Sequence, residues 1–110
     1  MHGRILIVDD VATNRIIYKV KLDDAFYEPL LAADGRSCLA IAREQRPDLI
    51  LLDLVLPDMP GTDVLRELRA DPVTRPIPVI VLTASRNAEE RLAALSGGAD
   101  DVMSKPVSDQ

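Results

Sequence analysis

Short runs of apolar residues alternate along the chain with stretches whose apolar positions recur at helical spacing. The apolar runs predict strands at residues 5–8, 27–32, 48–52, 76–82 and 101–104. The intervening stretches predict helices at residues 12–22, at 37–45, in the segment that carries Val64, Leu65 and Leu68, and at 87–95. Buried strands separated by amphipathic helices are typical of a parallel sheet covered on both faces. The pattern therefore predicts an α/β, doubly wound, five-stranded fold.

Two local signals refine this pattern. Pro29 lies inside the second predicted strand. Because proline lacks the N–H that a central strand needs, we expect this strand at an edge of the sheet. On the first predicted helix, the apolar side chains of Ile16, Ile17 and Val20 lie on one face.

Polar residues stand at the ends of four of the predicted strands. They are Asp9 and Asp10 after the first strand, Asp53 after the third, Thr83 after the fourth and Lys105 after the fifth. Each one alone is more typical of a helix N-cap, a turn or a solvated surface. In a parallel sheet, however, the carboxyl ends of the strands share one edge, which is where ligands bind. We therefore expect three carboxylates, a hydroxyl and an ammonium in one pocket.

These groups suit a phosphoryl transfer to a carboxylate. Three neighbouring carboxylates repel one another, and a hard divalent cation such as Mg²⁺, which prefers oxygen ligands, relieves that repulsion. Lys105 can pair with Asp53 or with a phosphoryl oxygen on it, and Thr83 can donate a hydrogen bond to a further oxygen. Charge neutralisation and positioning are most of what such a transfer needs.

Composition limits the class of protein. A chain of 110 residues is one domain in size, and its net charge of −5 argues against direct binding to nucleic acid. The single cysteine, Cys38, cannot form an internal disulfide. The sequence shows no signal peptide and no apolar run long enough to cross a membrane, so we expect a cytoplasmic domain.

The ordered set of strand-end motifs resembles the receiver domains of response regulators in two-component signalling. The matching segments are residues 5–10, 48–57 with Gly61, 79–84, 98–101 and Lys105-Pro106. The resemblance implies strand order 2-1-3-4-5 and a receiver domain over residues 1–110. It also implies phosphorylation by a sensor histidine kinase or a histidine phosphotransfer protein. Such a domain assists only its own phosphorylation and dephosphorylation. It switches an output domain or a partner, and that partner can be a second copy of the chain in a homodimer.

The resemblance also assigns roles to individual residues. Asp53 would be the phosphoacceptor, and Mg²⁺ would be bound by Asp10, by Asp53 and by the carbonyl of Val55, with Asp9 acting through water. Thr83 and Lys105 would bind the phosphoryl group. The peptide bond before Pro106 would be cis, which directs Lys105 into the pocket.

Two features depart from the family pattern. Val102 occupies a position where the family usually has Tyr or Phe, so the relay from Thr83 would be weakened. The fifth helix that normally follows the fifth strand is missing from this chain, which would leave apolar surface exposed. Residues 11–15 and 70–78 are similar to receivers fused to diguanylate cyclase domains.

Two other functions remain as alternatives. A degenerate receiver would serve only as a protein-interaction module, although all five pocket residues are present. A hydrolase of the haloacid dehalogenase type also uses a strand-end aspartate with Mg²⁺. It needs a second acid two residues after the nucleophile, where this chain has Val55.

Overall fold

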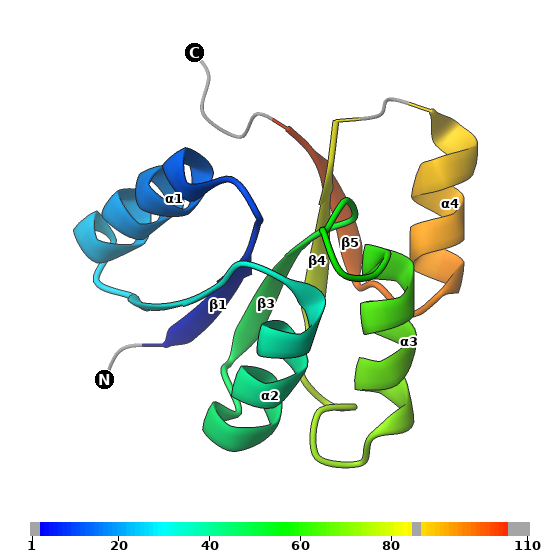
Figure 1. Ribbon diagram of the computed structural model, residues 1–110, viewed down its shortest axis with the longest axis horizontal. Helices are drawn as coiled ribbons and strands as arrows, with labels where there is room; N and C mark the ends of the chain where they lie inside the picture. Colours follow the sequence, from blue (N-terminus) through cyan, green and yellow to red (C-terminus); the bar gives the residue numbers. More distant parts are fainter. Residues whose placement is uncertain (1–2, 85–86, 106–110) are drawn as a thin grey trace.

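A computed structural model of the chain describes residues 3–84 and 87–105, which form a parallel sheet flanked by helices (Figure 1). The strands are β1 (Arg4–Val8), β2 (Glu28–Ala32), β3 (Leu49–Asp53), β4 (Val79–Thr83) and β5 (Asp101–Ser104). The helices are α1 (Ala12–Asp24), α2 (Gly35–Gln45), α3 (Gly61–Ala70) and α4 (Ala88–Ser96). The strand order is β2-β1-β3-β4-β5, as expected, and β2 with Pro29 lies at an edge.

The two faces of the sheet bury different residues. Leu6 and Val8 of β1 belong to the main core, where α2, α3 and α4 also contribute buried side chains. Ile7, between them in the sequence, points into a smaller cluster with Tyr18 of α1 and Leu82 of β4. This alternation is the two-residue period of a strand, and it places α1 on the opposite face from the other described helices.

Helix α1 does not turn the expected apolar face toward the sheet. Tyr18 is buried and Leu22 packs beside it, whereas Ile16 is 59% and Val20 52% exposed. The reason is geometric, because Tyr18 and Leu22 are four residues apart and form one stripe while Ile16 and Val20 form another. The predicted helix is confirmed, but packing against the sheet decides which of its stripes is buried.

Strand β4 begins at Val79, three residues later than the sequence pattern indicated. Pro76 and Pro78 have no N–H to donate to a neighbouring strand, so the preceding segment forms turns instead. The Arg69 guanidinium of α3 holds these turns by donating to the backbone carbonyls of Arg75 and Ile77.

Among the described residues, no helix is long and apolar enough to cross a membrane.

Candidate functional site

The strand register brings the predicted site residues to one edge of the sheet. Val8 pairs with Leu52, which places Asp9 beside Asp53 along the edge. Asp53 pairs with Leu82, the residue before Thr83, and Thr83 pairs with Ser104, the residue before Lys105. This edge is the upper one in Figure 1, where the strands end and the chain turns away from the sheet.

Three carboxylates meet there. One oxygen from each of Asp9, Asp10 and Asp53 lies within 4.8 Å of the other two. Asp9 is fully buried and Asp53 is 4% exposed, whereas Asp10 is exposed. The cluster therefore has two carboxylates withdrawn from water and a third at its open side. Carboxylate oxygens at this spacing are the ligand type that Mg²⁺ prefers, so these residues fit a magnesium ion.

The Lys105 ammonium is the cation of this cluster. Its Nζ lies 2.8 Å from Asp53 Oδ2 and 3.4 Å from Asp9 Oδ2. Partial burial acts to lower the pKa of Lys105, but the hydrogen bond and charge of Asp53, followed by those of Asp9, outweigh burial and raise this pKa. The side chain is therefore charged at neutral pH and offsets part of the negative charge of the carboxylates.

Asp53 is also held by the loop that follows it. The backbone N–H of Val55 donates to Asp53 Oδ1 over 3.0 Å, and the N–H of Gly61 donates to the carbonyl of Leu54 over 2.8 Å. A Cβ at Gly61 would lie 2.6 Å from the carbonyl oxygen of Asp53. Glycine is therefore required at the start of α3, because the loop folds back against β3.

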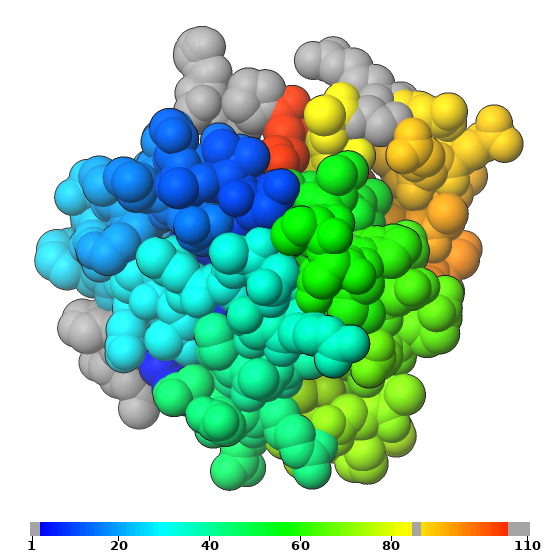
Figure 2. All heavy atoms as spheres, in the orientation of Figure 1, coloured from blue at the N-terminus to red at the C-terminus, as the bar shows by residue number. Residues whose placement is uncertain are grey.

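The loop after β3 is fastened to α2 by Asp58. The Asp58 carboxylate accepts hydrogen bonds from the backbone N–H groups of Gly35 at 2.8 Å and Arg36 at 2.9 Å. Met59 packs against the same turn, since a Cβ at Gly35 would lie 2.6 Å from Met59 Cγ. In Figure 2 the green loop after β3 lies beside the cyan start of α2. The sequence analysis assigned no role to Asp58, because only a long-range contact identifies its partner.

Asp9 has partners that the sequence analysis also missed. The N–H of Val11 donates to Asp9 Oδ1 at 2.9 Å, and Asn14 Nδ2 donates to Asp9 Oδ2 at 3.2 Å. The Arg15 guanidinium donates to the backbone carbonyl of Asp9 at 2.7 Å. The sequence did offer a signal, because Asn14 and Arg15 stand in the first turn of the helix that follows Asp9.

The other predicted residues are Thr83, Val102 and Pro106. Thr83 is buried at the end of β4, and its carbonyl accepts the N–H of Lys105 over 2.8 Å. Val102 is 5% exposed and pairs with Val81 inside the main core. Pro106, with the peptide bond predicted to be cis, lies outside the described residues.

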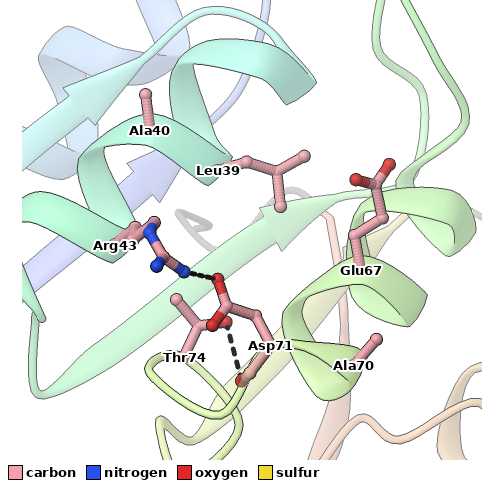
Figure 3. A pocket seen from close by; sticks show the side chains of 7 residues that line it. All are labelled: Leu39, Ala40, Arg43, Glu67, Ala70, Asp71 and Thr74. Carbon is pink, nitrogen blue, oxygen red and sulfur yellow. Dashed lines mark hydrogen bonds and ion pairs between the residues drawn. The ribbon is translucent and has the colours of Figure 1, made fainter.

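A hollow in the surface lies away from the carboxylate cluster. It has a volume of about 400 Å³ and lies between the C-terminal halves of α2 and α3 (Figure 3). Its lining includes the ion pair of Arg43 with Asp71 and the apolar side chains of Leu39 and Ala70. Because these helix ends lead into the starts of β3 and β4, the hollow lies at the opposite edge of the sheet from Asp53.

A five-stranded doubly wound sheet with an acidic cluster and a lysine at its carboxyl edge defines a class of signalling domain. The family model of the response regulator receiver domain matches residues 5–110, and this chain belongs to that family. Receiver domains are signalling modules that bind Mg²⁺ at an acidic pocket and take phosphoryl groups from histidine kinases.

Individual relatives agree with this assignment. The chain is 43% identical over 109 residues to response regulator PleD of Caulobacter vibrioides, covering 99% of this chain and 24% of PleD. Its structure is similar to that of chemotaxis protein CheY4 of Vibrio cholerae, with a TM-score of 0.92 and 31% identity over 98% of this chain and 90% of CheY4.

A third relative carries a metal. The receiver domain of sensor histidine kinase PA1611 from Pseudomonas aeruginosa, whose active-site cleft coordinates a magnesium ion, has a TM-score of 0.89 to this chain. The two are 34% identical over 98% of this chain and 88% of that domain. The chain thus spans about a quarter of PleD, 90% of the CheY4 chain and 88% of the PA1611 receiver domain.

Proposed function

We propose that this chain is a phospho-accepting receiver domain in which Asp53 takes a phosphoryl group from a sensor histidine kinase or a histidine phosphotransfer protein. The observation that carries the proposal is the contact of Lys105 Nζ with Asp53 Oδ2 at 2.8 Å, inside a cluster of three carboxylates. A buried strand-end carboxylate paired with an ammonium and open to a metal on one side is equipped as a nucleophile.

The residues of the cluster divide the task of holding Mg²⁺. Asp10 and Asp53 would bind the ion directly, together with the backbone carbonyl of Val55. Asp9 would act through water, and this role is supported by its two oxygens already accepting hydrogen bonds from Val11 and Asn14. The bound ion would neutralise charge on the carboxylates and on the transferred group.

The transfer itself is an in-line displacement. An oxygen of Asp53 attacks the phosphorus of the donor phosphohistidine, so that a P–O bond forms and the P–N bond breaks. The electron pair returns to the imidazole nitrogen of the donor, which then takes up a proton. Lys105 moves from the free carboxylate to the phosphoryl oxygens, and the hydroxyl of Thr83 donates to another of them.

Phosphorylation adds about two negative charges at the edge of the sheet and biases a two-state element. Residues 1–110 would act as one receiver domain, which works on itself rather than on a separate substrate. It would control a C-terminal output domain, a partner or a second copy of the chain. Residues 11–15 and 70–78 are similar to receivers fused to diguanylate cyclase domains, and this similarity favours a diguanylate cyclase as the output domain. The domain would act in the cytoplasm, without direct contact to nucleic acid.

Phosphorylation by acetyl phosphate with Mg²⁺, followed by intact-protein mass measurement, tests the assignment. The unmodified sequence should gain one phosphoryl group and Asp53→Asn none. Asp48→Asn is the matched control, because Asp48 stands just before the other end of β3, where its carboxylate accepts the N–H of Arg4. A phosphorylated Asp53→Asn variant would contradict the proposal. If the unmodified sequence gained no phosphoryl group and calorimetry showed no binding of Mg²⁺, the result would instead favour a degenerate receiver that acts only as a protein-interaction module.

A further inference from the structure

One ammonium serves two buried carboxylates in this site. The side chain of Asp9 is 0% and that of Asp53 6% exposed, and Lys105 lies 3.4 Å from the first and 2.8 Å from the second. Within residues 3–84 and 87–105, no other lysine or arginine forms an ion pair with either carboxylate. Because a buried carboxylate without partners is costly, Asp9 and Asp53 compete for Lys105.

Asn14 contacts the same oxygen of Asp9 that Lys105 approaches. Its Nδ2 lies 3.2 Å from Asp9 Oδ2, while the backbone N–H of Val11 serves Asp9 Oδ1 at 2.9 Å. Asn14 is itself partly buried in the first turn of α1. The amide is neutral, so it satisfies part of the hydrogen-bonding demand of Asp9 without adding charge to the cluster.

We propose that Asn14 is a positioning residue that keeps Lys105 on Asp53. By donating to Asp9 Oδ2, Asn14 lowers the demand of Asp9 for the ammonium, so that Lys105 stays at the shorter distance from Asp53. This inference rests on the proposed role of Asp53 as the phosphoacceptor. It concerns the step in which Lys105 must already stand beside the nucleophile to receive the phosphoryl oxygens.

Arg15 supports the same arrangement from the main chain. Its guanidinium donates to the backbone carbonyl of Asp9 at 2.7 Å and forms no ion pair with the Asp9 carboxylate. Two consecutive residues of α1 therefore reach back to Asp9, one to its side chain and the other to its backbone. The cation of Arg15 is directed at the backbone, which leaves Lys105 as the charge that the carboxylates share.

The test removes the amide donor and follows both Lys105 and the reaction. Asn14→Leu keeps a side chain of similar volume without a donor, and Asn14→Ala is a second variant should leucine prevent folding. Thr13→Ala is the control, because Thr13 is exposed on the same helical turn. Metal-free crystal structures give the position of Lys105, and acetyl phosphate gives the phosphorylation rate over a range of Mg²⁺ concentrations.

Loss of Asn14 should move Lys105 Nζ from Asp53 to Asp9 in the metal-free structure. The phosphorylation rate at saturating Mg²⁺ should fall by about tenfold, which corresponds to the loss of one charge-assisted hydrogen bond. The Mg²⁺ concentration that gives half of the maximal rate should stay close to that of the parent chain. A residue that only stabilised α1 would shift the urea midpoint and leave Lys105 in place.

Two results would overturn the inference: Lys105 still on Asp53 in both Asn14 variants, or a saturating rate within about twofold of the parent chain. Failure of the proposed function is a separate outcome, since it would show as no phosphorylation of the parent chain itself. In that case the metal-free position of Lys105 would still decide what Asn14 does.

Discussion

Replacement of Lys105 by methionine isolates the energy of the shared ion pair. Methionine keeps most of the aliphatic stem and removes the charge, which leaves Asp9 and Asp53 buried without a cation among the described residues. At 2.8 Å and an effective dielectric constant of about 20, the attraction between Lys105 and Asp53 is about 6 kcal/mol. Much of it is offset by the desolvation of the charged groups.

Removing one partner of a buried pair typically costs about 3–5 kcal/mol. The side chain of Lys105 keeps 18% exposure, so water screens the pair somewhat and we expect the lower end, about 3 kcal/mol. For a domain of this size, about 1 kcal/mol lowers the melting temperature by roughly 4–8 °C. Urea and thermal unfolding of metal-free Lys105→Met should therefore show a loss of more than about 10 °C. Saturating Mg²⁺ should recover much of it, because the ion replaces the missing charge.

Lys19→Met is the matched control. Lys19 Nζ lies 3.1 Å from Asp23 Oδ2, a distance like that in the buried pair, but the two side chains are 50% and 48% exposed. An exposed pair contributes little, so this variant should unfold within about 0.5 kcal/mol of the parent chain. If Lys105→Met in metal-free buffer proved as mild as Lys19→Met, the reasoning from burial would be refuted.

Two further predictions concern groups behind the site. Burial, followed by the charges of Asp34 and Asp58, raises the pKa of Cys38 to about 12. Alkylation of this thiol at pH 8 should therefore occur only as fast as the chain unfolds. Reaction at the rate of a free thiol would contradict this. Hydrogen bonds from the backbone N–H group of Gly35, followed by that of Arg36, lower the pKa of Asp58 in the folded chain. The Asp58 carboxylate therefore contributes stability above pH 3.8, the value of the unfolded chain, and this contribution is lost as the pH falls through the lower folded-state pKa. Urea midpoints should show a constant gap between the parent chain and Asp58→Ala near neutral pH that closes in acid, whereas a gap independent of pH would refute the role of its charge.

Much of the site followed from sequence because it depends on where strands end. The apolar runs gave the order of strands and helices along the chain, and Pro29 placed β2 at an edge without any knowledge of its neighbours. Once the sheet is parallel, the residues after each strand must share one edge. Asp9, Asp53 and Lys105 could therefore be brought together before any contact was known.

Contacts between side chains and backbone at long range could not be found in this way. The carboxylate of Asp58 binds the first turn of α2, which lies 22 and 23 residues earlier in the chain. The contact of Asn14 with Asp9 spans only five residues, but whether the two side chains meet depends on the orientation of the first turn of α1. Hydrogen bonds depend on direction and on tenths of an ångström, and neither is encoded in a pattern of polar and apolar positions.

The sequence alone thus determined the class of fold and the identity of the groups at its carboxyl edge, because the periods of helix and strand and the rules of parallel sheets are local or topological. Only the tertiary structure decided which stripe of α1 is buried, where β4 begins and how Lys105 is divided between two carboxylates. These outcomes depend on the packing of segments distant in sequence, where competing partners are resolved by distance and burial.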